Sequence, residues 1–144
     1  MTLDRRSFIK VLGSASGLAL AGCASQGSVG STTEIMPKAA ARRVAVVCGG
    51  FGGAIAAKYI RMLDKSIEVV LVEQNRQFIS CPFSNFYIAG LMNDMSTLTI
   101  GYDKLAANHG IKMVYGVATA IDPAAKKVVT TEGTLTYDRL IVSP

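Results

Sequence analysis

The sequence predicts an α/β fold built around a parallel β-sheet, and three observations support this prediction. Arg43–Val47 and Ile67–Val72 are short runs rich in β-branched residues, as in strands that are buried on both faces of a parallel sheet. A glycine-rich turn, Cys48–Gly53, directly follows the first run. Ala54–Leu63 then has the apolar spacing of a helix, so the order is strand, turn, helix, strand.

Composition favours one folded domain and gives no indication of nucleic-acid binding. Half of the 144 residues are apolar, which is enough to form a core. The formal net charge is +5, but the basic residues are scattered rather than arranged in a stripe with aromatic residues between them. We therefore expect residues 42–144 to form a single domain and do not expect a nucleic-acid partner.

The N-terminal segment has the features of a twin-arginine signal peptide. Arg5 and Arg6 precede a hydrophobic residue and a weakly apolar run, Val11–Ala21, which Gly and Ser interrupt. This run is too short to cross a bilayer, because a spanning helix needs about 20 apolar residues. We therefore predict that residues 1–22 direct export of the folded protein to the periplasm.

A lipoprotein cleavage pattern closes this leader. Leu20-Ala21-Gly22-Cys23 matches the bacterial pattern in which the cysteine becomes a lipidated N-terminus, so Cys23 would carry the only membrane anchor. The alternative is ordinary cleavage near Cys23 and Ala24, which would discard the cysteine. The residues that follow are rich in Ser, Gly, Thr and Ala without apolar periodicity, so residues 23–41 are predicted to be a flexible linker.

The glycine-rich turn and the second strand match the fingerprint of a Rossmann-type dinucleotide-binding unit. In the pattern G-x-G-x-x-G, Gly50 and Gly53 take the second and third glycine positions, and Cys48 replaces the first. Glycines let backbone N–H groups at the helix start approach a pyrophosphate. Glu73 would accept hydrogen bonds from ribose hydroxyls and disfavour a 2′-phosphate. The predicted cofactor-binding residues are Cys48, Gly49, Gly50, Phe51, Gly52, Gly53 and Glu73.

The second half of the chain is predicted to extend the parallel sheet and to insert an antiparallel meander. Residues 75–95 are polar and turn-rich. The expected elements are a helix over Tyr102–Asn108, a third parallel strand over Ile111–Tyr115, meander strands over Val117–Ile121, Lys127–Thr131 and Thr134–Tyr137, and a buried strand over Arg139–Ser143. A sheet that ends on a core strand predicts an incomplete cofactor-binding domain, the N-terminal part of a larger protein.

Five segments point to a particular family of dinucleotide-binding proteins. They are Val44–Ile60, Val69–Glu73, Cys81–Asn85, Gly101–Leu105 and Tyr137–Pro144. Together and in this order they resemble the flavoprotein subunit of flavocytochrome c sulfide dehydrogenase, a family with two dinucleotide-binding domains. The Cys-Pro-Phe-Ser-Asn and Gly-Tyr-Asp stretches are much more specific to it than the glycine turn is. The resemblance implies FAD as cofactor, sulfide as substrate and a c-type cytochrome subunit as partner.

The resemblance also implies a covalent cofactor. In that family a cysteine at the position of Cys81 forms a thioether with the 8α-methyl group of the flavin, and Pro82 would hold Cys81 in an extended conformation. From the residues alone, an isolated cysteine such as Cys81 is usually a small buried hydrophobe, and a disulfide with Cys48 is a further alternative. The family's redox-active cysteine pair lies beyond this sequence, so catalytic residues are not assigned and the fragment alone is expected to be inactive. No metal site is predicted.

The sequence is also compatible with two other functions. One is a different flavoprotein oxidoreductase of the same fold that uses a pyridine nucleotide or a quinone and binds FAD reversibly. The other is a membrane-tethered, non-enzymatic lipoprotein in which Cys48 has made the nucleotide fingerprint ineffective.

Overall fold

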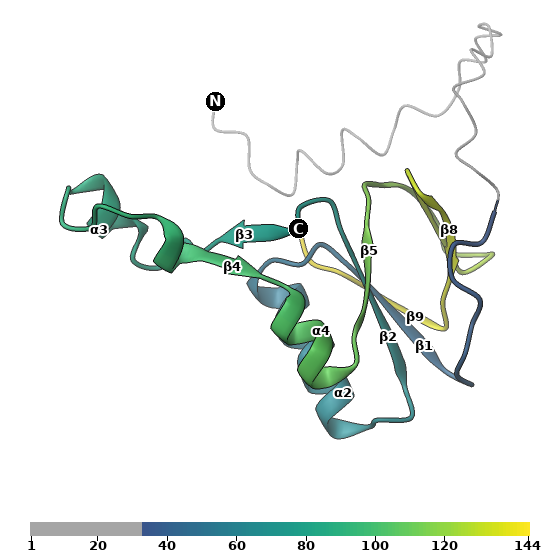
Figure 1. Ribbon diagram of the computed structural model, residues 1–144. Coiled ribbons are helices and arrows are strands. Elements are labelled where there is room, and N and C mark those ends of the chain that lie inside the picture. Colours follow the sequence, from purple (N-terminus) through teal and green to yellow (C-terminus); the bar gives the residue numbers. More distant parts are fainter. Residues whose placement is uncertain (1–32) are drawn as a thin grey trace, which may run out of the picture.

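The computed structural model describes residues 33–144, so the twin-arginine motif and Cys23 lie outside the described residues. A parallel sheet in the order β5-β2-β1-β9 forms its centre (Figure 1). Its strands are β1 (Arg43–Val47), β2 (Glu68–Glu73), β5 (Lys112–Tyr115) and β9 (Arg139–Val142). Every neighbouring pair in this sheet is parallel, which confirms the predicted fold class.

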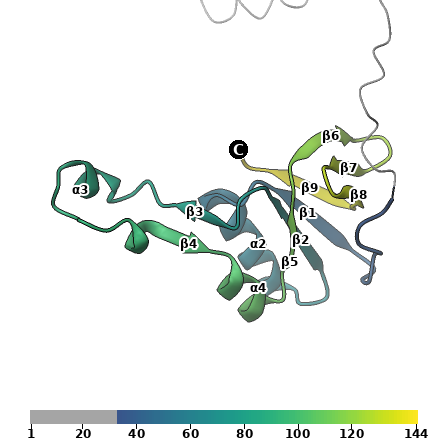
Figure 2. The ribbon, with the colours of Figure 1, turned by 45° about the horizontal axis from the view of Figure 1, so that its top comes forward.

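Helices cover one face of the parallel sheet and an antiparallel sheet covers the other (Figure 2). The helices are α2 (Phe51–Leu63) and α4 (Asp103–His109). The second sheet contains β6 (Ala118–Asp122), β7 (Lys127–Thr130) and β8 (Gly133–Thr136), which pair as a meander. The inserted antiparallel meander is therefore confirmed. No helix within residues 33–144 is long and apolar enough to cross a bilayer.

The side chains of β1 alternate between these two outer layers. Val46 packs in one apolar cluster with Ala57 of α2, whereas Ala45 packs in another cluster with Val128 and Leu135 of the meander. All five side chains are fully buried. Because both faces of the sheet are covered, its central strands are apolar on both sides, which explains why their sequence does not alternate.

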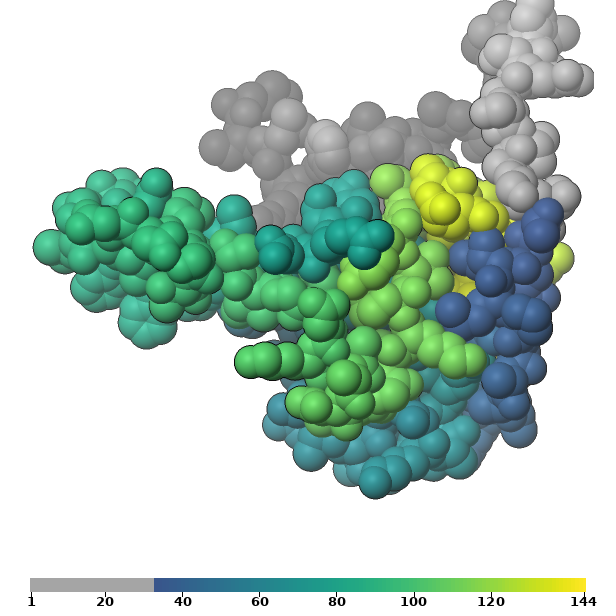
Figure 3. Space-filling model, in the orientation of Figure 1, coloured from purple at the N-terminus to yellow at the C-terminus, as the bar shows by residue number. Residues whose placement is uncertain are grey.

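A long excursion between β2 and α4, residues 77–101, stands away from the layers as an arm (Figure 3). It contains β3 (Gln77–Ile79), α3 (Ser84–Ile88), a 3-10 turn (Ser96–Leu98) and β4 (Thr99–Gly101), and β3 pairs antiparallel with β4. The sequence predicted only a polar, turn-rich segment here. These elements have five residues or fewer, which is too short for a hydrophobic period to show in the sequence.

The segment before β1 is attached to the domain from Thr33 onward. The N–H of Ile35 donates to the carbonyl of Thr134 in β8 at 3.0 Å, and the Arg43 guanidinium donates to the carbonyl of Met36 at 2.9 Å. The last part of the predicted flexible linker therefore makes defined contacts. Composition does not reveal them because they use backbone atoms, which every residue type has.

Candidate functional site

The glycine-rich turn lies at the carboxyl edge of the parallel sheet, between β1 and α2. The strand order reverses at β1, since β2 and β9 flank it on opposite sides, and ligands of open α/β sheets bind at such a reversal. The N–H of Cys48 donates to the carbonyl of Val72, and the N–H of Ser143 donates to the carbonyl of Val47, each at 3.0 Å. The turn is thus fixed to both neighbouring strands.

The first turn of α2 supplies backbone donors at this edge. The helix begins at Phe51, three residues before its predicted start at Ala54. The N–H of Ala54 donates to the carbonyl of Gly50 at 2.9 Å. The N–H groups of Phe51, Gly52 and Gly53 precede this bond and have no acceptor inside the helix. Together with the positive end of the helix dipole, such groups bind phosphate oxygens.

Two glycines of the fingerprint have the surroundings that a bound pyrophosphate requires. A Cβ atom at Gly50 would meet no atom of the described residues within 4 Å, so the backbone there is open to a ligand. A Cβ atom at Gly53 would overlap the carbonyl oxygen of Cys48, so only glycine allows α2 to lie this close to the end of β1. The cradle therefore fits the diphosphate of a dinucleotide.

Cys48 adopts a backbone conformation that favours glycine. Its φ is 72°, in the left-handed region that residues other than glycine seldom occupy. The residue is half-buried and its thiol is free. This conformation costs about 1 kcal/mol for a residue with a side chain, and the turn nevertheless keeps its shape.

A cavity of about 290 Å³ opens beside the turn. Oε2 of Glu73, on its wall, accepts the N–H of Gly49 at 2.6 Å, and Oε1 accepts the N–H of Asn75 at 3.0 Å. Carboxylate oxygens have several lone pairs, so Glu73 retains capacity for ribose hydroxyls. Gly116 to Ala118 also line this cavity, and the sequence does not predict their role. The available signal was Gly116, a turn residue at the carboxyl end of a parallel strand.

Cys81 and Pro82 lie on the arm, in the segment between β3 and α3. Both are exposed, so Cys81 is not a buried hydrophobe. The carbonyl of Cys81 accepts the N–H of Ser84 at 3.0 Å, and Phe83 between them has a φ of 69°. A bulky residue in this region marks local backbone strain, which often occurs at functional sites. Cys48 and Cys81 are both free, so the alternative disulfide is absent.

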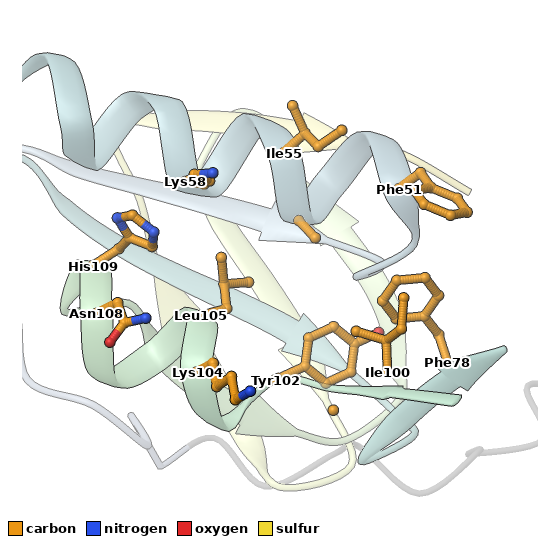
Figure 4. Close-up of a pocket in the computed structure, with 12 residues that line it drawn as sticks. Phe51, Ile55, Lys58, Phe78, Ile100, Tyr102, Lys104, Leu105, Asn108 and His109 are labelled. Atoms are coloured by element: carbon orange, nitrogen blue, oxygen red, sulfur yellow. The ribbon is translucent and has the colours of Figure 1, made fainter. Parts of the chain in front are cut away.

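An apolar pocket of about 320 Å³ lies between α2 and α4, on the helical side of the turn (Figure 4). The rings of Phe51 and of Phe78 in β3 form a T-shaped pair, with centroids 5.3 Å apart. Tyr102 follows at 5.8 Å from Phe78. The predicted role of Phe51 at the cofactor thus concerns its backbone N–H, because its side chain lines this pocket. The aromatic contacts connect the glycine turn to the base of the arm.

Comparison with known sequences finds relatives for most of this domain. Residues 42–144 match the family model described as pyridine nucleotide-disulphide oxidoreductase. Over 44 residues the chain is 64% identical to the sulfide dehydrogenase [flavocytochrome c] flavoprotein chain from Chlorobaculum thiosulfatiphilum. That match covers 31% of this chain and 92% of the relative.

Solved structures with the same fold include two that act on sulfur compounds. The sulfide:quinone oxidoreductase from Aquifex aeolicus has a TM-score of 0.65 and 26% sequence identity, and the match covers 71% of this chain and 24% of that one. The NAD-dependent persulfide reductase from A. fulgidus has a TM-score of 0.62 and 25% identity, covering 69% and 20%. The chain therefore spans a quarter or less of the length of these solved relatives.

Proposed function

The chain belongs to the pyridine nucleotide-disulphide oxidoreductase family, and we propose that it is the N-terminal part of a subunit that oxidises sulfide and passes the electrons to a c-type cytochrome. It is a flavin-dependent oxidoreductase of Rossmann-type fold with FAD as cofactor. Bound FAD supplies the ability to take up two electrons and release them one at a time. The 64% identity over 44 residues with a flavocytochrome c flavoprotein chain carries the proposal of sulfide and cytochrome.

The turn at the carboxyl edge of the sheet is the proposed FAD site. The N–H groups of Phe51, Gly52 and Gly53 would hold the pyrophosphate, which the open space at Gly50 admits. Glu73 would accept the ribose hydroxyls from the wall of the adjoining cavity.

Cys81 is the proposed point of covalent attachment for the flavin. Its thiol is free and exposed on the arm, and the strained residue Phe83 follows two positions later. A covalent bond would keep the cofactor on a protein that works in a compartment where lost FAD is not replaced. This assignment rests on the resemblance of the Cys-Pro-Phe-Ser-Asn stretch to the sulfide dehydrogenase family.

Peptide mass spectrometry of the full-length protein, expressed with its cytochrome partner and denatured in acid, tests this assignment. We expect a flavin-modified peptide that contains Cys81, its loss in Cys81→Ser and its persistence in Cys48→Ser. Sulfide-dependent reduction of cytochrome c by the same preparation would then test the reaction. Free flavin with unmodified Cys81 would count against attachment at this residue.

A quinone-linked oxidoreductase is the second candidate, favoured by the similarity to the sulfide:quinone oxidoreductase. Comparing a soluble quinone with cytochrome c as electron acceptor separates the two functions, and bleaching of the flavin by NADH would indicate a pyridine-nucleotide-linked enzyme. A purified protein without any FAD would instead support the non-enzymatic lipoprotein, with Cys48 as the reason.

The proposed compartment is the periplasm, reached by the twin-arginine route, with Cys23 as the attachment point of a lipid anchor. Substituting Arg5 and Arg6 together by lysine should retain the protein in the cytoplasm. Incorporation of labelled fatty acid that persists in Cys23→Ser would contradict Cys23 as the attachment point, and no incorporation in the unchanged protein would contradict the anchor.

A further inference from the structure

The peptide groups on both sides of Gly49 are held by side chains from other parts of the chain. The N–H of Gly49 donates to Oε2 of Glu73 at 2.6 Å, and its carbonyl accepts the hydroxyl of Tyr102 at 2.9 Å. Glu73 ends β2, whereas Tyr102 immediately precedes α4. Two distant elements therefore fix the second residue of the glycine-rich turn.

The Tyr102 side chain is itself fixed in place. It is 1% exposed and packs in the apolar cluster that contains Val46 and Ala57. A Cβ atom at Gly49 would lie 2.8 Å from its hydroxyl oxygen, so the ring and the turn are in direct contact. Burial, and then the nearby negative charge of Glu73, raise the pKa of Tyr102 to about 12. The hydroxyl therefore remains a hydrogen-bond donor at neutral pH.

The residue before Gly49 explains why this turn needs support. Cys48 has a φ of 72°, which glycine adopts without steric cost but cysteine does not. A residue in such a conformation persists only where the surrounding structure determines it. The bond to Glu73 restrains the peptide group between Cys48 and Gly49, and the bond from Tyr102 restrains the next peptide group, between Gly49 and Gly50. A change in the backbone conformation of Cys48 would displace these two peptide groups first.

We propose that Tyr102 and Glu73 compensate for the missing first glycine of the fingerprint by locking Gly49, so that the N–H groups at the start of α2 stay directed at the FAD pyrophosphate. Tyr102 is then a positioning residue that acts on the cofactor through the turn. The proposal rests on FAD binding at this turn and is independent of the substrate and of the electron acceptor.

The test combines Tyr102→Phe with Cys48→Gly in the full-length protein carrying Cys81→Ser, so that FAD binds reversibly. Tyr102→Phe keeps the ring under Gly49 and removes only the hydroxyl. We expect it to raise the Kd for FAD, measured by flavin fluorescence quenching, about fivefold, the value of one hydrogen bond. Adding Cys48→Gly should return the Kd to within about twofold of the starting protein, because glycine adopts the turn unaided.

Tyr137→Phe is the matched control. It removes a hydroxyl from a buried tyrosine of the other apolar cluster and should leave the Kd unchanged. Thermal unfolding of each apoprotein measures any general loss of stability. Such a loss would raise the Kd equally with and without Cys48→Gly, so it does not affect the difference between the two backgrounds. An unchanged Kd in Tyr102→Phe, or a loss that Cys48→Gly does not reduce, would overturn the proposal. A starting protein that binds no FAD would refute the FAD site itself, and with it this proposal.

Discussion

The two ends of the parallel sheet use the same residue type in different ways. At the amino end, Glu68 begins β2 and pairs with Arg43, the first residue of β1, at 2.6 Å. At the carboxyl end, Glu73 ends β2 and accepts the N–H of Gly49, just beyond β1, also at 2.6 Å. One carboxylate joins two strands where they start, and the other shapes the turn that follows them.

Burial separates these two ends. The Arg43 side chain is fully buried and that of Glu68 is 5% exposed, and Lys112 of β5 also pairs with Glu68 at 2.5 Å. At the other end, Glu73 borders a cavity and Gly50 faces open space. The amino end therefore satisfies its polar groups within the chain, whereas the carboxyl end leaves donors available to a ligand. Substitutions at the first end should change stability, and those at the second should change FAD binding.

The largest expected effect is that of Arg43→Ala on stability. The substitution removes the guanidinium from the buried carboxylate of Glu68 and from the carbonyls of Met36 and Pro37. Losing one member of a buried ion pair costs about 3–5 kcal/mol. Because Glu68 keeps its pair with Lys112, we expect a loss near the lower limit, at about 3 kcal/mol. Urea unfolding of the full-length protein measures it.

Arg42→Ala is the matched control for this prediction. Arg42 neighbours Arg43 in sequence, but its side chain is 63% exposed where it pairs with Asp64. Its loss should leave the unfolding midpoint almost unchanged. Equal losses of stability from Arg43→Ala and Arg42→Ala would show that burial of an arginine at the amino end of the sheet does not increase its contribution to stability.

Gly50→Ala should give the opposite result at the carboxyl end. The added methyl group meets no described atom, so the free energy of unfolding of the apoprotein should change by less than about 1 kcal/mol. The same methyl group occupies space that the pyrophosphate needs, so the Kd for FAD should rise at least about tenfold in the Cys81→Ser background. Gly101→Ala, which adds a methyl group in β4, should leave the Kd unchanged. Unaltered FAD affinity in Gly50→Ala would move the cofactor away from this turn.

The sequence predicts the important residues at the carboxyl end of the sheet far better than those at the amino end. Gly50, Gly53 and Glu73 stand at spacings that a binding fingerprint requires, so their positions follow from the chain itself. Arg43 and Glu68 carry no such pattern. Their pairing depends on the parallel register of β1 and β2, which places these two residues side by side only once the sheet has formed.

The same limit applies to the residues that complete the site. Tyr102 was placed at the start of a helix, but its hydrogen bond to Gly49 joins residues 53 positions apart. The sequence predicts only turns for the arm, because its helices and strands are too short for a hydrophobic period. Cys81 was singled out through its family resemblance, since a single cysteine has no spacing to interpret.

A smaller effect should appear when the amino end is titrated with acid. Burial alone would raise the pKa of Glu68, but hydrogen bonds from Arg43 and Lys112 outweigh it and hold the pKa below the ordinary value of 4.5. The ionised form is thus favoured in the folded protein, so its contribution to stability is present above pH 4.5 and disappears as the pH falls below it.

Comparing Glu68→Gln with the unchanged protein isolates this contribution. The free energy of unfolding, measured from about pH 7 to about pH 3, should fall more steeply in the unchanged protein, and the two curves should converge in acid. Other carboxylates contribute equally to both curves. Parallel curves over the whole pH range would mean that the contribution of Glu68 to stability does not depend on its charge.

The smallest expected effect is that of Lys38→Ala, which also acts at the amino end of the sheet. Lys38 pairs with Asp138 at 2.6 Å, the same distance as in the buried Arg43–Glu68 pair, yet the two side chains are 32% and 36% exposed. Water replaces the lysine when it is removed, and Asp138 still accepts the N–H of Arg43 at 2.6 Å. The unfolding midpoint should therefore not change measurably. A loss of stability comparable to that of Arg43→Ala would show that an ion pair stabilises the amino end whether or not it is buried. Burial would then not explain the difference between the amino and carboxyl ends of the sheet.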